Sequence, residues 1–401
     1  MSSLAETNLF KPIKVGPVTL TNRVVLAPTT RLRNTETLVA TDSMLEFYIE
    51  RARNNGGLLI SEGAFTSPDV GSFPFAPMLY TAELVFSWKK ITDAVHPNGS
   101  SIAIQIAGLG RAGDPKDFKD GGFPFAAPSA IYLTEDSKEV AEKVGNLLRE
   151  FTIDDLHRVK DDFISAAKRS VDRAGFDIVE LHAANMFLLN QFLEEASNQR
   201  TDQYGGSIEN RSRFVLEVVD GVIEAVGADR TAVRISRYCR SQGGESVDAK
   251  VSPIVNYGYF VNELERRAKN GKRLAYLLFV EPRVSGDNII EESYVPDSSW
   301  LNEIWKGIII RSGNLLHGDG YPLLRKYVGS GDRTLIGSSR YYTSNPDLVN
   351  RLKNGYFLTQ YDGPTFYRVM TNEGYLTSPN CGETVYKQEI LSSVPKPLAQ
   401  D

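Results

Sequence analysis

The sequence of 401 residues is poor in the side chains that form disulfides and metal sites. It has two cysteines, Cys239 and Cys381, and four histidines that are scattered along the chain. Two cysteines cannot form a disulfide framework, which favours a reducing compartment, and we expect a cytoplasmic protein. Scattered histidines do not give the ligand spacing of a zinc site, so we expect no metal.

Long hydrophobic runs and an excess of positive charge are also absent. No apolar stretch approaches the length of a membrane span, and the N-terminus lacks an apolar signal core. The formal net charge is −5, which gives no basic footprint for nucleic acid. There is no GxGxxG in a Rossmann context and no GxSxG elbow. These absences argue against a membrane protein, a nucleic-acid-binding protein and a serine hydrolase.

What the chain does contain is a regular alternation of short apolar segments with amphipathic ones. Eight segments have the composition of buried strands: 23–27, 58–61, 101–106, 178–181, 231–236, 274–280, 307–311 and 334–337. Helical spacing lies between them, as in 152–174, where Thr152 is a suitable N-cap. Eight strands alternating with helices predict an α/β fold, a single (β/α)8 TIM barrel.

Three segments add to this barrel. Residues 12–21 resemble a short hairpin that would cap the bottom of the barrel, and 108–150 break the pattern as an excursion over the barrel mouth. Residues 375–401 have the character of a tail packed on the outside. No Pro/Gly/Ser linker divides the chain, so we interpret 1–401 as one domain.

Polar residues or glycines lie at or near the C-terminal halves of these strands. They are Thr30, Gly63, Gln105, His182, Asn185, Arg234, Gly313 and Arg340. Each alone is more often a hydrogen-bonded core residue. In a closed parallel barrel these positions converge on one mouth, where barrel enzymes place their chemistry. Together they predict a functional site there.

The loops after the seventh and eighth strands form the usual phosphate site of such barrels. Here they offer Gly313-Asn314 and Ser339-Arg340, which combine accessible backbone N–H groups with a bidentate anion ligand. Arg234 has no obvious partner in the sequence, so an anion or an electron-rich ring edge would satisfy it. Glu281 and Arg283 are interpreted as a structural ion pair or cap.

The segments HAANMFLLNQFL, from His182, and NQRTDQYGGSIENRSRF, from Asn198, resemble the core motif of the old yellow enzyme family, the FMN-dependent ene reductases. The resemblance extends from NLFKPIKVG near the start to TFYRVM at 365–370. It includes RTLIGSSRYYTSNPDLVNRL around the last strand. It implies a barrel with non-covalent FMN at its C-terminal mouth and NADPH as the reductant.

The resemblance also implies roles for individual residues. The FMN site would consist of Thr30, Gly63, Gln105, Arg234, Gly313, Asn314, Ser339 and Arg340. Among these, Gln105 and Arg234 would hold the pyrimidine edge of the ring. His182 and Asn185 would bind the carbonyl oxygen of the substrate, and Tyr367 would line the substrate pocket.

Three positions depart from the family pattern. Phe187 stands where the family has the tyrosine that protonates the substrate. Arg237 replaces a proline, and the segment 238–248 after it lacks the aromatic pocket wall expected there. Ser339 replaces the glycine that usually precedes the phosphate-binding arginine.

The resemblance implies an NADPH dehydrogenase that reduces the activated C=C bond of α,β-unsaturated carbonyl compounds, or quinone and nitro acceptors. Because Phe187 has no proton to give, two alternatives stay open. One is a flavin-dependent isomerase, and the other is a phenol- or steroid-binding flavoprotein with weak turnover. The expected partners are small enones, quinones or phenols, with a homodimer as one candidate assembly.

Overall fold

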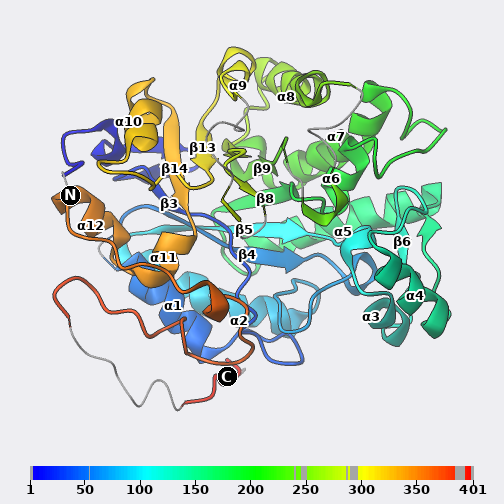
Figure 1. Cartoon of the computed structure of the whole chain (residues 1–401), viewed down its shortest axis with the longest axis horizontal. Helices are drawn as coiled ribbons and strands as arrows, with labels where there is room; N and C mark the ends of the chain where they lie inside the picture. Colours follow the sequence, from blue (N-terminus) through cyan, green and yellow to red (C-terminus); the bar gives the residue numbers. More distant parts are fainter. Residues whose placement is uncertain are drawn as a thin grey trace.

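In this computed structural model, the structure describes residues 3–53, 55–238, 241–244, 251–285, 288–289, 297–383 and 393–398. Eight parallel strands form a closed barrel (Figure 1). They are β3 (Val24–Leu26), β4 (Leu58–Phe65), β5 (Ser101–Ala107), β8 (Ile178–Ala183), β9 (Thr231–Ile235), β10 (Tyr276–Val280), β13 (Ile309–Ser312) and β14 (Thr334–Ser338). Each overlaps one predicted segment, so the predicted barrel is confirmed.

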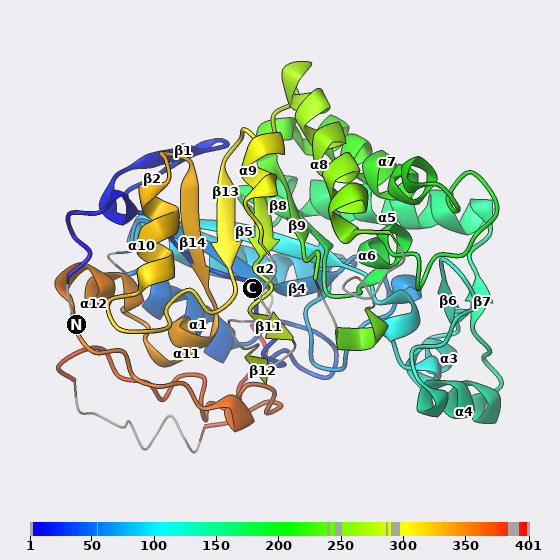
Figure 2. The same cartoon turned by 45° about the horizontal axis from the view of Figure 1, so that its top comes forward.

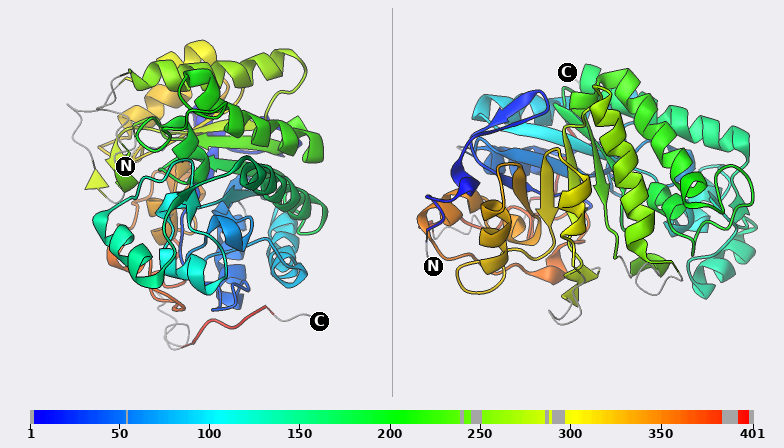
Figure 3. Two further views of the ribbon diagram at one scale, coloured as in Figure 1. Left: turned by 90° about the vertical axis from the view of Figure 1, so that its right-hand side faces the viewer. Right: turned by 90° about the horizontal axis from the view of Figure 1, so that it is seen from above.

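Helices cover the outside of this barrel. They include α1 (Asp42–Ala52), α2 (Ala82–Val95), α5 (Ile153–Asp172), α7 (Ile208–Val226), α8 (Pro253–Lys269), α10 (Pro322–Gly329) and α12 (Leu348–Asn354). In both views of Figure 3 the green helices of residues 153–269 stack along one side of the strands. Thr152 caps α5 in a capping box with Asp155, as its sequence predicts.

Because successive side chains of a strand face opposite ways, the barrel has an interior and an outer layer. The interior is apolar toward the N-terminal ends of the strands, where Ile60, Ala103 and Ile178 belong to one cluster. The hairpin β1 (Ile13–Val15) and β2 (Val18–Leu20) packs into this cluster. The hairpin therefore caps the bottom of the barrel, as predicted, and leaves the opposite end for polar groups.

The excursion 108–150 forms a small unit with its own core. It contains α3 (Pro115–Asp120), α4 (Glu135–Val144), β6 (Ala126–Ala127) and β7 (Arg149–Glu150), which lie together to one side in Figure 2. Arg111 Nη2 donates to the carbonyl of Gly243 at 3.3 Å, next to the pocket residue Gln242. The described excursion therefore borders the mouth, while the pocket itself is lined by other segments.

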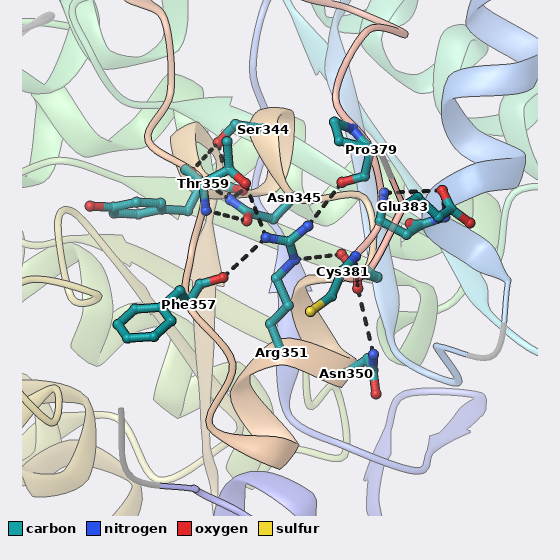
Figure 4. Close-up of polar contacts among 12 residues, drawn as sticks. Ser344, Asn345, Asn350, Arg351, Phe357, Thr359, Pro379, Cys381 and Glu383 are labelled. Carbon is teal, nitrogen blue, oxygen red and sulfur yellow. Dashed lines mark hydrogen bonds and ion pairs between the residues drawn. The ribbon is translucent and has the colours of Figure 1, made fainter. Parts of the chain in front are cut away.

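A buried arginine fixes the chain that follows the last barrel helix (Figure 4). Arg351 is 4% exposed and donates to Asp347 Oδ1 at 2.7 Å and to the carbonyls of Phe357 and Pro379 at 3.0 and 2.9 Å. It also donates to the hydroxyl of Thr359 at 3.0 Å. This residue therefore holds both ends of the segment 357–379, which contributes a wall of the pocket described below.

The predicted tail is described up to residue 383 and again over 393–398. The N–H of Asp42, at the start of α1, donates to the carbonyl of Lys396 at 2.9 Å. The N–H of Leu398 donates to the carbonyl of Ala40 at 2.9 Å. These parts of the tail lie on the outer layer of the barrel.

Candidate active site

A cavity of about 750 Å³ opens at the C-terminal ends of the barrel strands. Every site residue named from the sequence lines it: Thr30, Gly63, Gln105, His182, Asn185, Phe187, Arg234, Gly313, Asn314, Ser339, Arg340 and Tyr367. They come from the ends of seven barrel strands and from the chain after α12. The structure therefore brings together residues that the sequence spreads over more than 300 positions.

A buried carboxylate orients the amide of Gln105. The Gln105 Nε2 group donates to Glu180 Oε1 at 2.6 Å, and both residues are inside the barrel. Because a carboxylate oxygen accepts, this bond leaves the amide oxygen of Gln105 for the cavity. That oxygen lies beside Gly63, where an added Cβ would be 3.3 Å from it. The two residues thus present a hydrogen-bond acceptor beside a small, open surface.

Arg234 on β9 lies in the field of the same carboxylate. Burial raises the pKa of Glu180 to about 7, against the opposing effects of Arg234, Gln105 and Tyr276. The sequence-based inference that Arg234 lacks a partner is therefore wrong, because Glu180 is a nearby acidic group. Glu180 was not singled out from the sequence. Its signal is a charged residue two positions before His182, on the inward face of an apolar strand.

His182 is held as a neutral hydrogen-bond donor. It is 4% exposed, and burial, followed by the charge of Arg234, lowers its pKa well below the usual range. Its Nδ1 accepts the N–H of Ala184 at 3.3 Å. A neutral imidazole that accepts at Nδ1 carries its proton on Nε2. Nε2–H is therefore the donor that His182 can offer to a molecule in the cavity.

The backbone after His182 makes an unusual turn. Asn185 and Met186 both have positive φ, 56° and 59°, in the left-handed region that costs a non-glycine residue about 1 kcal/mol or more. Two hydrogen bonds hold this turn: Asn185 N–H donates to Ser236 Oγ at 2.7 Å, and Met186 N–H donates to Asn190 Oδ1 at 2.9 Å. The turn places Asn185 on the cavity wall beside His182.

A second buried acid stands behind this turn. The Asn190 side chain donates to the hydroxyl of Tyr257 at 2.7 Å, and that hydroxyl donates to Glu194 Oε1 at 2.5 Å. Burial raises the pKa of Glu194 to about 7. None of these three residues lines the cavity. They reinforce the short helix α6 (Leu188–Leu193), which the sequence did not predict.

The opposite end of the cavity suits an anion. Gly313 has φ of 104°, and a Cβ there would lie 2.8 Å from the carbonyl oxygen of Glu281, so only glycine fits. Asn314 Nδ2 is buried and has no hydrogen-bond partner among the described residues. Ser339 and Arg340 line the same cavity from the end of β14. A buried amide donor without a partner, together with a guanidinium, fits the phosphate of a nucleotide.

One sequence interpretation near this end needs correction. The carboxylate of Glu281 pairs with the guanidinium of Arg311 and accepts the hydroxyl of Ser298 at 2.7 Å. The predicted ion pair between Glu281 and Arg283 is therefore wrong in its partner. Arg311 comes from the neighbouring strand β13, and this across-strand pairing cannot be read from residues two apart in sequence.

Aromatic rings line the remaining wall. Phe73, Phe187, Tyr238, Phe366 and Tyr367 all face the cavity. Phe187 meets the His182 ring edge-on at a centroid distance of 4.6 Å. The prediction that 238–248 lacks an aromatic wall is wrong at Tyr238. Within that segment, 239–240, which include Cys239, and 245–248 lie outside the described residues.

Tyr238 is itself held by the residue that departs from the family pattern. The guanidinium of Arg237 lies 3.5 Å from the centroid of the Tyr238 ring. Burial lowers the pKa of Arg237 to about 10. Arg237 therefore supports one aromatic wall of the cavity through a cation–π contact.

A closed parallel barrel with a cavity of about 750 Å³ at the C-terminal ends of its strands has the architecture of barrel enzymes, whose active sites lie at this face. The chain matches the NADH:flavin oxidoreductase / NADH oxidase family over residues 8–358 and belongs to that family. It is 40% identical to a probable NADPH dehydrogenase of Candida albicans, covering 100% of this chain and 95% of the relative. It is 41% identical to enoate reductase 1 of Kluyveromyces lactis, covering 96% of both.

Solved structures of related proteins support the same family. Old Yellow Enzyme from Pichia sp. AKU4542 has a TM-score of 0.94 at 52% identity, covering 99% of this chain and 100% of that one. Morphinone reductase in complex with tetrahydroNAD has a TM-score of 0.78 at 34% identity, covering 94% and 98%. The resemblance to the old yellow enzyme family is confirmed.

The protein is an FMN-dependent oxidoreductase of the NADPH dehydrogenase and enoate reductase family, as predicted, with FMN as cofactor and NADPH as reductant. The alternative of an isomerase or a ligand-binding flavoprotein is not favoured. Enzymes of this kind act on small molecules. Across the described residues, no cluster of metal-ligating side chains occurs, and no helix has the length and apolarity to cross a membrane.

Proposed function

We propose that FMN lies along the cavity with its ring over the barrel interior and its phosphate at the loops after β13 and β14. Thr30, Gly63, Gln105 and Arg234 would contact the ring. Gly313, Asn314, Ser339 and Arg340 would hold the phosphate. The unpartnered Nδ2 of Asn314 and the acceptor oxygen of Gln105 support this placement, because each matches a group that flavin nucleotides provide. When bound there, FMN would supply hydride transfer between NADPH and an acceptor.

The substrate oxygen is held by His182 and Asn185. His182 offers Nε2–H from a neutral ring, and the Asn185 side chain lines the same part of the cavity. Two fixed donors at one oxygen polarise an α,β-unsaturated carbonyl group and stabilise the negative charge that grows on the oxygen as the C=C bond is reduced. The neutral Nε2–H donor at His182 is the observation that carries this proposal.

Phe187 determines which acceptors the site reduces slowly. Its ring packs against His182, but it has no hydroxyl to donate a proton. The carbon next to the carbonyl must then receive its proton from water or from another group. Acceptors that need no proton at carbon, such as quinones and nitro compounds, are unaffected by this loss. The site therefore favours them relative to simple enones.

The ligands, the oligomeric state and the cell compartment are part of the same proposal. Enones, quinones and phenols fit the aromatic wall with a pair of oxygen-binding donors at its base. The low cysteine content agrees with a cytoplasmic setting. The assembly proposed there is a homodimer. Sedimentation of the purified holoenzyme tests the assembly, and a monomer at micromolar concentration would contradict the dimer.

A phenol titration tests the oxygen site. A phenol stacked on FMN with its oxygen at His182 should produce a long-wavelength absorbance band. His182→Ala should weaken phenol binding about tenfold or more, since it removes a hydrogen bond to a charged oxygen. His157→Ala, on the exposed face of α5, is the matched control and should bind phenol like the wild type. Unchanged affinity in His182→Ala would remove the basis of the proposal.

A further inference from the structure

Glu180 occupies a position that the proposed roles do not yet explain. It lies inside the barrel, on the strand that delivers His182, and it is fully buried. An isolated buried carboxylate is costly, and an apolar residue would serve packing better at this level of the interior. Its neighbours are the two residues placed at the pyrimidine edge of FMN, Gln105 and Arg234.

We propose that Glu180 is the positioning residue of the flavin site: it orients the Gln105 amide and balances the charge of Arg234. The inference rests on the proposed placement of FMN. Glu180 does not line the cavity, so it acts through Gln105 and Arg234 and has no contact with the cofactor.

The first role is geometric. A glutamine amide can point either its oxygen or its nitrogen at a ligand, and the two faces have opposite hydrogen-bonding character. The 2.6 Å bond from Gln105 Nε2 to Glu180 removes that choice and keeps the oxygen toward Gly63 and the cavity. An acceptor oxygen at this place suits an N–H of the flavin pyrimidine ring. Without Glu180, the amide is free to rotate.

The second role is electrostatic. Reduction of FMN adds negative charge to the ring, and a positive side chain at the pyrimidine edge favours that state. Arg234 supplies the positive charge, and the Glu180 carboxylate offsets part of it. The negative charge on Glu180 therefore keeps the midpoint potential of the bound flavin lower than Arg234 alone would set it.

The ionisation of Glu180 is itself responsive to pH. The titratable or charged groups that face it are Arg234 on β9, Tyr276 on β10 and His182 on its own strand, with the neutral Gln105 on β5. Burial is the largest influence and raises the pKa of Glu180 to about 7. Below that pH the carboxyl becomes neutral, and the potential should rise more steeply with falling pH than flavin reduction alone requires.

Two substitutions separate the roles. Glu180→Gln keeps an acceptor oxygen for Gln105 but removes the charge. It should retain FMN within about twofold of the wild type, shift the midpoint potential to more positive values and lose the extra pH dependence near pH 7. Glu180→Asp keeps the charge but is one methylene shorter. It should keep a potential near that of the wild type while releasing FMN about five- to tenfold faster, the effect of losing one hydrogen bond.

Glu194→Gln is the matched control. Glu194 is also fully buried with a pKa raised to about 7, yet it bonds to Tyr257 and lies away from Gln105 and Arg234. It should leave the potential and its pH dependence unchanged. FMN release is followed by flavin fluorescence after dilution of the holoenzyme, and the potential by spectroscopic redox titration between pH 5.5 and 8.5.

The outcomes distinguish this inference from the proposed function. A Glu180→Gln potential equal to that of the wild type would overturn the electrostatic role, and unchanged FMN release in Glu180→Asp would overturn the positioning role. Either variant decides its own role if the other fails to fold. Gln105→Leu and Arg234→Leu are the reference: if these two also change nothing, the FMN placement itself is wrong. If they change FMN binding while both Glu180 variants behave like the wild type, only the role of Glu180 is lost.

Discussion

The floor and the roof of the cavity are built in different ways. The floor consists of side chains on barrel strands, such as Gln105 and Arg234, whose backbones are paired on both sides. The roof consists of aromatic rings such as Phe73, Tyr238 and Tyr367, carried by connecting segments. A rigid floor suits a cofactor that must keep one pose, while a roof on loops can change between relatives without disturbing the barrel. Cofactor binding and substrate choice are thus assigned to separate parts of the chain.

The largest expected effect comes from restoring a proton donor to the roof. Phe187→Tyr should speed reduction of a simple enone by about a hundred- to ten-thousandfold, the usual contribution of a general acid. The substitution leaves the residues of the floor unchanged, so the rate of hydride transfer from NADPH to FMN should stay the same. Stopped-flow measurement of the two half-reactions separates them. If the wild type already reduces cyclohexenone as fast as its FMN is reduced by NADPH, then another group donates the proton, and Phe187 does not limit the rate.

Next in size is the loss of the residue that anchors the roof. Arg351→Ala removes the ion pair with Asp347 and three further hydrogen bonds, and should lower the free energy of unfolding by about 3 kcal/mol. Substrate affinity should fall, because Tyr367 lies in the segment 357–379 that Arg351 holds. FMN retention should change little. Thermal unfolding of the holoenzyme measures the loss. The exposed Arg266→Ala is the control, with an expected change below about 0.5 kcal/mol. Equal losses in both variants would contradict an anchoring role.

A smaller effect is expected at the proposed phosphate site, in the loops after β13 and β14. Arg340→Ala should weaken FMN binding about tenfold, because one charge-assisted contact is lost while Gly313 and Asn314 remain. Reduction potential and enone specificity should stay near the wild type. FMN retention after desalting and a fluorescence titration provide the measurement. A variant that keeps FMN as tightly as the wild type would show that the phosphate lies elsewhere.

The last prediction concerns Glu194, the acid behind the turn at Asn185, and its effect depends on pH. Glu194 has a pKa raised to about 7 in the folded protein, above the ordinary value of a glutamate, so the folded state holds its proton more strongly than the unfolded state. Its stabilising contribution is complete at low pH and is lost as the pH rises toward and through 7. Glu194→Gln should therefore gain stability relative to the wild type between pH 5 and 7, by at most about 1.4 kcal/mol per pH unit. Urea unfolding at several pH values tests this, and a pH-independent difference would refute it.

The sequence predicts the floor better than the supports behind it. Gln105, His182 and Arg234 are polar interruptions of apolar strands, and their convergence follows from the barrel once the strands are counted. Glu180 interrupts its strand in the same way and was overlooked, because its partners come from other strands. Ser236 and Asn190 hold the turn at Asn185 through contacts that only the fold creates. The partner of Glu281 was misassigned for the same reason.

The roof was less predictable because its residues belong to connecting segments. The sequence predicts no aromatic wall from 238–248, yet Tyr238 lines the cavity and makes a cation–π contact with Arg237. Phe73 has no periodic pattern around it that would mark it as a cavity residue. Tyr367 was identified only through the family resemblance. Loop residues carry function without the strand or helix spacing on which sequence reasoning depends.

The barrel closes between its first and last strands, where Val24 of β3 pairs with Ile336 of β14. Thr30 lies four residues after the end of β3 and Arg340 two residues after the end of β14, so neighbouring parts of the cavity wall come from opposite ends of the chain. During synthesis, a ribosome-bound chain that stops before residue 334 lacks both the strand that closes the barrel and part of the proposed phosphate site. We therefore expect FMN to bind only after the last strand has been synthesised, and C-terminal truncations before residue 334 should accumulate as colourless, aggregation-prone chains.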